Sequence, residues 1–198
     1  LTLLDQTSGQ RTESSLRREM NTDALTGLPN RAGFGDLLDE RITDGNCAEY
    51  AVLAVNLDRF SRINACMGSL TGDELLISVA RRVKGALRAR DQLARTGGDE
   101  FGILLGLSDG ADDARVAAER IQAALATPFR LSDFEIQVDC SIGIALGGDA
   151  AGQAEDLIRH AQFAVKQSKR SGRPELYHDH AFDIVRSQFS IETELRRA

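Results

Sequence analysis

Two glycines and two acidic residues stand together near the middle of the chain, at Gly97, Gly98, Asp99 and Glu100. An alternating apolar run follows them, and this pattern predicts a strand that leaves a hairpin turn. We expect the glycines to supply positive φ angles in a tight turn and to let a ligand approach the backbone. Carboxylates gathered at such a tip favour a cation site, although Gly-Gly-Asp is also ordinary turn chemistry. These residues alone leave both interpretations open.

The elements that must position this hairpin follow from the spacing of the apolar residues. Residues 51–55 form a short continuous apolar run, which is typical of a central strand covered on both faces. Apolar residues recur at helical spacing in other segments, which predicts helices over about residues 30–43, 71–87, 111–126 and 154–170. The second of these helices opens on Thr71-Gly72-Asp73-Glu74, which has the form of a capping box.

Two more strands are expected in the last third of the chain. Residues 134–146 alternate between apolar and other side chains without a break, which predicts one long antiparallel strand with a wet face. A short strand is expected over residues 175–178. Helices and strands in this order predict an α+β fold, with a mainly antiparallel sheet and helices packed on it.

The composition narrows the class of protein. The 198 residues carry a net charge of −6, which disfavours a nucleic-acid surface because such domains usually have a basic excess. No run approaches the ~18 apolar residues of a membrane span, and no signal peptide is recognisable. Cys47, Cys66 and Cys140 are odd in number and lack a C-x-x-C spacing. This pattern favours a reduced, cytoplasmic compartment and argues against a zinc site.

Several motifs, in order along the chain, resemble those of the GGDEF domain, the diguanylate cyclase family. They are residues 23–31, residues 56–60 with Asn64 and Gly72-Asp73, residues 97–101, residues 141–145, and Lys169 with Gly172-Arg173. The resemblance covers roughly residues 20–178. It implies a palm-type fold, similar to nucleotidyl cyclases and ferredoxins, with a central sheet of five strands. It also implies binding of GTP with Mg²⁺ or Mn²⁺, and condensation of two GTP to cyclic di-GMP within a homodimer.

The resemblance assigns a metal site to the residues considered first. Asn56, the carbonyl of Leu57, Asp99 and Glu100 would converge on Mg²⁺ if the strand over residues 51–55 lies beside the hairpin. Magnesium prefers oxygen ligands and often uses one or two carboxylates with substrate phosphates. Asp99 and Glu100 would be the catalytic residues, with Glu100 either a metal ligand or the base that takes the proton from the attacking hydroxyl.

The same resemblance assigns the nucleotide contacts. Asn64 and Asp73 would bind the guanine edge, whereas Asp73 could instead serve the dipole of its helix. Lys169 and Arg173 would bind the outer phosphates, or else lie as solvated cations at a helix end. The backbone amides of Phe60 and Ser61 would also face phosphate, because a helix is expected to begin there.

A second site is implied further upstream. Arg88-Ala89-Arg90-Asp91 matches the family's R-x-x-D inhibitory site, and five residues separate it from Gly97. In that site an arginine binds product phosphate or guanine and the acid accepts from the base. The motif is common by chance, so its fixed distance from Gly97 is what makes it informative.

The chain departs from the family at several positions. Asn56 stands where active relatives carry an aspartate that binds the metal, and Ser61 replaces a lysine near the transferring phosphate. Further replacements are Ala65 for aspartate, Ser69 for histidine and Lys166 for tyrosine. Mutation of residues that hydrogen-bond to a metal ligand typically lowers metal affinity or activity about 10- to 100-fold. The loss of a charge on the ligand itself should therefore lower them by at least as much. Catalysis is affected more than nucleotide binding.

The flanks suggest a piece of a longer signalling protein. Residues 1–20 resemble the exit of a sensor domain with a connecting helix, residues 21–178 would be the GGDEF domain, and residues 179–198 resemble a helix leading to an EAL phosphodiesterase domain. Two functions stay open. The chain is either a cyclase that makes cyclic di-GMP, or an impaired module that binds GTP or cyclic di-GMP and regulates an adjacent EAL domain.

Overall fold

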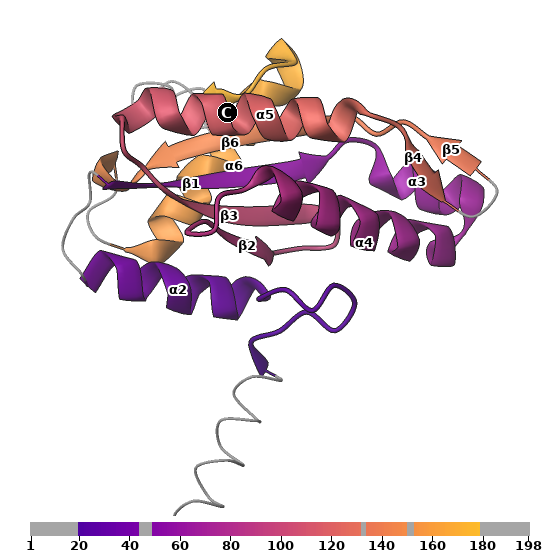
Figure 1. Cartoon of the computed structure of the whole chain (residues 1–198), viewed down its shortest axis with the longest axis horizontal. Coiled ribbons are helices and arrows are strands. Elements are labelled where there is room, and N and C mark those ends of the chain that lie inside the picture. The colour runs from indigo at the N-terminus through magenta and orange to yellow at the C-terminus, as the bar shows by residue number, and fades with distance from the viewer. Residues whose placement is uncertain (1–19, 44–48, 132–133, 150–152, 179–198) are drawn as a thin grey trace, which may run out of the picture.

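A computed structural model describes residues 20–43, 49–131, 134–149 and 153–178. Within these residues, strands form a five-stranded sheet in the order β2-β3-β1-β6-β7 (Figure 1). Their bounds are β1 Tyr50–Leu57, β2 Gln92–Arg95, β3 Glu100–Gly106, β6 Cys140–Leu146 and β7 Glu175–Leu176. The expected flanking segments, 1–19 and 179–198, lie outside the described residues.

Strand β1 lies at the centre of the sheet and pairs antiparallel with both β3 and β6. Strand β2 is also antiparallel to β3, and only β7 runs parallel to its neighbour β6 among the described strands. The prediction of a mainly antiparallel α+β fold is therefore confirmed. Seven of the eight residues of β1 are buried, as expected for a strand covered on both faces.

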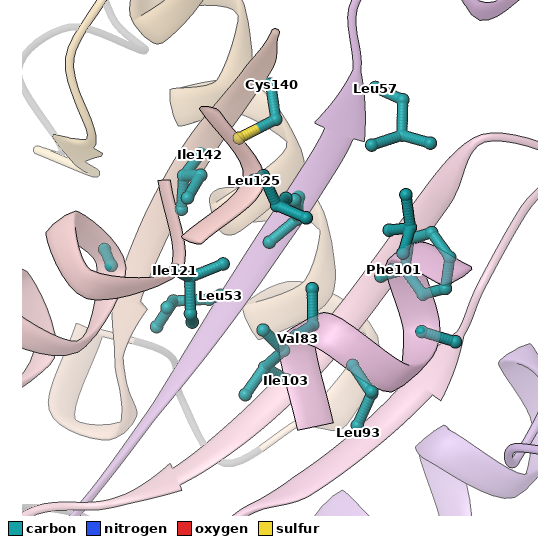
Figure 2. Packing of buried hydrophobic residues seen from close by; sticks show 14 of the residues in the cluster. Leu53, Leu57, Val83, Leu93, Phe101, Ile103, Ile121, Leu125, Cys140 and Ile142 are labelled. Carbon is teal, nitrogen blue, oxygen red and sulfur yellow. The ribbon is translucent and has the colours of Figure 1, made fainter. Parts of the chain in front are cut away.

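Helices cover both faces of this sheet. Alternate residues of β1 belong to two separate apolar clusters: Leu53 packs with α4 (Ser69–Ala86) and α5 (Gly110–Ala126), and Val52 packs with α2 (Arg31–Thr43) and α6 (Ala154–Ser171). Figure 2 shows the first cluster, in which Leu53 and Ile103 of the sheet lie near Val83 of α4 and Ile121 of α5. The period of two in the strand thus fixes which residues face each helical layer.

A close contact seats α6 directly on the sheet. A Cβ atom built on Gly143 of β6 would lie 2.1 Å from the Ala161 carbonyl oxygen and 2.5 Å from the Val165 nitrogen. Only glycine leaves room for this approach of helix to strand. The position of α6 relative to the sheet, and of every side chain that α6 presents there, depends on this contact.

The predicted capping box at Thr71 is wrong. Helix α4 begins at Ser69, and the Thr71 hydroxyl donates to the Met67 carbonyl oxygen at 3.1 Å from within the helix. A preceding short helix, α3 (Phe60–Met67), ends at Gly68, whose φ is 86°. This positive φ separates the two helices, so the boundary is set by the glycine and not by a threonine cap.

The prediction of one unbroken strand over residues 134–146 is also wrong. The segment Phe134–Ile136 is a separate strand, β5, which pairs with β4 (Phe129–Leu131) in a two-stranded sheet of its own. Alternation continues through the connecting residues, since Val138 is buried. An alternating pattern indicates which side chains are buried, but it does not show that the strand partner changes from β4 to β1 along the segment.

None of the described helices is long and apolar enough to cross a membrane.

Candidate functional site

The β2–β3 hairpin brings its turn against the end of β1. The register places Asn56 opposite Glu100, and the Leu57 N–H donates to the Asp99 carbonyl oxygen at 3.0 Å. In Figure 1 this end of the sheet lies toward α3. The structure thus brings together the residues that the sequence analysis assigned to a metal, namely Asn56, Leu57, Asp99 and Glu100.

The turn itself differs from the expected one. Neither Gly97 nor Gly98 has a positive φ, so that part of the prediction is wrong. The N–H groups of Thr96 and Gly97 both donate to the Glu100 carbonyl oxygen, at 2.9 and 3.2 Å. Two residues on one strand opposite a single residue on its partner is the pattern of a β-bulge, which adds one residue on the β2 side of the turn. The glycine matters here for space, because a Cβ atom on Gly97 would lie 3.3 Å from the Glu100 Cβ.

Glu100 is held by a residue that sequence reasoning missed. The side-chain amide of Gln162, on α6, donates to Glu100 Oε1 at 2.5 Å. Residues opposite each other in antiparallel strands place their side chains on the same face. The face of Asn56 and Glu100 is therefore the α6 face, and the site here has carboxylate and amide oxygens around one strand end. Hard cations prefer such oxygens.

A second acid at the end of β1 links three motifs. The Ser141 hydroxyl lies 3.0 and 2.9 Å from the two carboxylate oxygens of Asp58, and Lys169 Nζ lies 3.9 Å from Asp58 Oδ1. Ser141 is buried and Lys169 is about half exposed. Asp58 and Lys169 thus form a long, partly exposed ion pair beside Ser141. The sequence analysis placed Asp58 only within the motif of residues 56–60 at the end of the buried strand.

A cavity of about 600 Å³ opens beside this pair. The C-terminal halves of α5 and α6 form its walls together with the start of β6, and its lining includes Asp58, Asp139, Glu119 and Lys169. Burial raises the pKa of the Cys140 thiol to about 12, and the charges of Asp58 and Asp139 add to the rise. This cysteine is therefore a neutral, buried thiol at physiological pH.

Asn64 and Asp73 come from neighbouring helices. Asn64 lies on α3 and Asp73 on α4, one residue after Gly72. Asn64 Oδ1 is buried without a hydrogen-bond partner, and a Cβ atom on Gly72 would lie 1.7 Å from it. A buried acceptor with no partner is rare and fits a site that a hydrogen-bond donor fills. The N1 and N2 hydrogens of guanine are such donors.

The remaining residues that the sequence analysis assigned to phosphate lie at or near helix ends. Phe60 and Ser61 begin α3, whose N-cap residue Arg59 makes no side-chain cap and has a φ of 59°. Lys169 lies in the last turn of α6, and Arg173 follows Gly172, which closes that helix in a left-handed conformation. Helix N-termini attract anions, so the placement of the α3 amides suits phosphate.

The R-x-x-D turn lies at the other end of the same hairpin. Asp91 directly precedes β2, and its Oδ1 accepts from the Gly106 N–H at 3.3 Å. The guanidinium of Arg88 binds Asp113 of α5 through two hydrogen bonds, of 2.7 and 3.0 Å. The structure therefore separates this turn from the residues around Asn56.

The loop that contains Asp23 and Thr26 supports the β2–β3 hairpin through Arg95. The Arg95 guanidinium lies 3.1 and 3.0 Å from the two oxygens of Asp23 and donates to the Gly98 carbonyl oxygen at 2.8 Å. Burial alone would raise the pKa of Asp23, but hydrogen bonds from Thr26 and Arg95 outweigh it and lower that pKa. Sequence reasoning missed Arg95, because the two partners are 72 residues apart.

The donor set fits a magnesium site that substrate completes. Among the described residues, no three His, Cys, Asp or Glu side chains lie close enough to hold a metal by themselves. The end of β1 and the hairpin turn instead offer the Asn56 amide, the Leu57 carbonyl and the carboxylates of Asp99 and Glu100 as oxygen ligands. Magnesium usually keeps water or phosphate ligands besides one or two carboxylates, so this sparse set suits it.

Comparisons with known proteins identify the family. Residues 20–175 match the family model described as "Diguanylate cyclase, GGDEF domain", and the chain belongs to this family. It is 34% identical over 196 residues to the cyclic di-GMP phosphodiesterase PdeR of Escherichia coli, covering 98% of this chain and 30% of that protein. It is 40% identical over 164 residues to the diguanylate cyclase TpbB of Pseudomonas aeruginosa, covering 81% of this chain and 38% of TpbB. The chain thus spans about a third of the length of these relatives.

A solved structure supports the fold. The isolated GGDEF domain of TpbB superposes with a TM-score of 0.78 at 37% identity, over 83% of this chain and 99% of that domain. The palm-type fold implied by the sequence motifs is therefore confirmed.

Proposed function

We propose that this chain is a diguanylate cyclase domain of cyclic di-GMP signalling. It binds GTP with Mg²⁺ or Mn²⁺, and two such molecules condense to cyclic di-GMP with release of pyrophosphate. The observation that carries the proposal is the joining of β1 to the hairpin turn, where Asn56 lies opposite Glu100 and Leu57 bonds to Asp99.

The metal-binding residues are Asn56, the Leu57 carbonyl, Asp99 and Glu100. The bound cation supplies charge neutralisation at the α-phosphate that the ribose hydroxyl attacks. Glu100 accepts a hydrogen bond from Gln162 through one oxygen, which orients the carboxylate. Its role is to bind the metal or to take up the proton of the attacking hydroxyl.

Four side chains and one helix end bind the nucleotide. Asn64 and Asp73 accept from the guanine edge, and Lys169 and Arg173 neutralise the outer phosphates. The amides of Phe60 and Ser61 bind phosphate at the start of α3. Asp58, two residues before Phe60, pairs with Lys169, whose Nζ lies 3.9 Å from Asp58 Oδ1.

The assembly needs a second copy. One domain holds one GTP, which is half of the product, so two loaded domains must face each other in a homodimer. We further propose that residues 1–20 and 179–198 connect residues 21–178 to a sensor domain and to an EAL domain, in the cytoplasm. This proposal is supported by the relative PdeR, which is named a cyclic di-GMP phosphodiesterase and of whose length this chain matches 30%.

A second function is favoured by one residue. Asn56 brings no negative charge to the metal, so turnover is expected to fall more than GTP binding. In this alternative the domain binds GTP or cyclic di-GMP and regulates its neighbour. Cyclic di-GMP binds at Arg88 and Asp91 in either case.

The test compares the unaltered chain with Asn56→Asp. We expect slow production of cyclic di-GMP from GTP and Mn²⁺, and a gain of about 10- to 100-fold after the substitution. Gln92→Glu adds the same charge at an exposed position of β2 and should change nothing. No product from the unaltered chain, with activity only after substitution, assigns the regulatory function. Failure of both chains to bind GTP overturns the cyclase, and failure to bind both GTP and cyclic di-GMP overturns the regulatory function as well.

A further inference from the structure

The acid of the R-x-x-D turn is already hydrogen-bonded within the chain. Asp91 Oδ2 accepts from the Arg88 N–H at 2.8 Å, and Oδ1 accepts from the Gly106 N–H at 3.3 Å. The Asp91 N–H in turn donates to the Arg88 carbonyl oxygen at 3.0 Å. These bonds close the turn between α4 and β2 and hold it against the end of β3.

The arginine of the turn is also engaged. Arg88 Nη2 donates to Asp113 Oδ1 at 2.7 Å, and Nη1 donates to Asp113 Oδ2 at 3.0 Å. A guanidinium binds a phosphate through the same pair of parallel donors. The Asp113 carboxylate therefore occupies the Nη1–Nη2 edge of Arg88, which is one of the two edges through which a guanidinium binds a phosphate.

Asp113 is itself firmly placed. Its side chain is 11% exposed, against 43% for Arg88, and its Oδ2 also accepts from the Ser108 N–H at 3.1 Å. Arg90 Nη2 lies 3.9 Å from the same oxygen and donates to the Ser108 hydroxyl at 2.8 Å. The Arg88 hydrogen bonds lower the pKa of Asp113, so this carboxylate stays charged at neutral pH.

We propose that Asp113 is an internal competitor for the phosphates of cyclic di-GMP at Arg88. The product site of this chain is closed while Asp113 holds Arg88, and it opens when the carboxylate moves aside. The apparent affinity of such a site falls in proportion to the fraction of time that it is open. The inference rests on the product site included in the proposed function, but it makes Asp113 the residue that sets its affinity.

The experiment is calorimetry with cyclic di-GMP on the 198-residue chain and on Asp113→Asn. Asparagine keeps an oxygen for the Ser108 N–H but no longer forms the ion pair. We expect binding to tighten about tenfold, as for a site that was open roughly one tenth of the time. Asp112→Asn is the matched control, because Asp112 lies in the same turn and pairs with Arg115 instead. Its affinity should equal that of the unaltered chain.

A second variant protects the test against misfolding. Asp113→Ser also leaves an oxygen near the Ser108 N–H and should tighten binding in the same direction. Thermal melting shows whether each variant folds. Unchanged affinity in both Asp113 variants overturns the proposal. An equal gain in Asp112→Asn also overturns it, because the effect would then be one of net charge alone.

One double variant separates this proposal from the product site itself. Arg88→Ala in the Asp113→Asn chain should abolish the gained affinity, which supports both assignments. Tight binding in the double variant would place the ligand elsewhere and overturn both. Loss of binding on Arg88→Ala, without any gain on Asp113→Asn, would retain the product site and overturn only the competitor. Binding of GTP in the same samples should not change.

Discussion

The two ends of the β2–β3 hairpin carry similar residues in opposite states. At the turn end, Glu100 is held through one oxygen by Gln162, and on the nearby helix α3 Asn64 Oδ1 lies buried without a partner. At the other end, Arg88 and Asp91 are both hydrogen-bonded to groups of the chain itself. Groups with unused hydrogen-bonding capacity are available to a ligand, whereas satisfied groups must first be released. The comparison therefore predicts strong effects of mutation on catalysis at one end and on affinity for product at the other.

The largest expected effect is on Glu100→Gln. This change removes the charge of a proposed metal ligand or base and should lower turnover by more than about 100-fold. Rates of cyclic di-GMP formation are best measured in the Asn56→Asp chain, where activity is highest. Asp91→Asn makes the same chemical change at the far end and should leave turnover within about twofold. Equal losses of turnover in Glu100→Gln and Asp91→Asn would contradict the claim that only the turn end of the hairpin takes part in catalysis.

A large loss of stability is expected for Gly143→Ala. The added methyl group would lie 2.1 Å from the Ala161 carbonyl oxygen, which forces α6 away from β6. Overpacking of this kind costs about 1–3 kcal/mol of unfolding free energy. The control is Gly35→Ala in α2, where nothing lies within 4 Å of the added atom. Urea titration measures both, and an equally stable Gly143→Ala protein would show that α6 is not seated by this contact.

The brace between Asp23 and Arg95 predicts a pH dependence. The folded state lowers the pKa of Asp23, so its contribution to stability is complete above the ordinary aspartate pKa of about 3.9. That contribution is lost as the pH falls through the lower folded value. Asp23→Asn should cost about 1.5–3 kcal/mol at neutral pH and progressively less in acid. Denaturant midpoints from pH 7 downward check this, and a pH-independent difference would mean that no ion pair is involved.

The smallest effect sharpens the role of α6. Gln162→Met removes the hydrogen bond that orients Glu100 and should lower turnover about tenfold. This corresponds to a rise of roughly 1.4 kcal/mol in the activation free energy. Gln167→Met, on the same helix, is the control and should retain full activity. A change in the Mn²⁺ concentration needed for half-maximal rate would show that Gln162 acts through Glu100. Melting temperatures that fall without any change in rate would indicate a structural role alone.

Local patterns predicted much of the fold and only part of the site. The helical spacing of apolar residues placed α2, α5 and α6 within a residue or so of their bounds, because burial of one helix face is recorded in the sequence itself. The pairing of β5 with β4 could not be read in the same way, since alternation does not identify a partner strand. The turn at Gly97 was located correctly, whereas the positive φ angles expected of its two glycines are absent.

The missed site residues share a physical reason. Gln162 is 62 residues from Glu100, and Asp113 is 25 residues from Arg88. Each pair meets only through the packing of a helix onto the sheet, and neither glutamine nor aspartate on a helix differs locally from a solvated residue. The motif residues were found because short spacing and residue type were enough to suggest their chemistry.

The most direct test of the central claim is a crystal structure with Mn²⁺ and a GTP analogue that cannot react. The anomalous signal of manganese should lie about 2 Å from the Leu57 carbonyl oxygen and a carboxylate oxygen of Asp99 or Glu100. Guanine should lie against Asn64 and Asp73, and the outer phosphates near Lys169. Manganese elsewhere, or nucleotide bound only at the Arg88 end of the hairpin, would contradict the account.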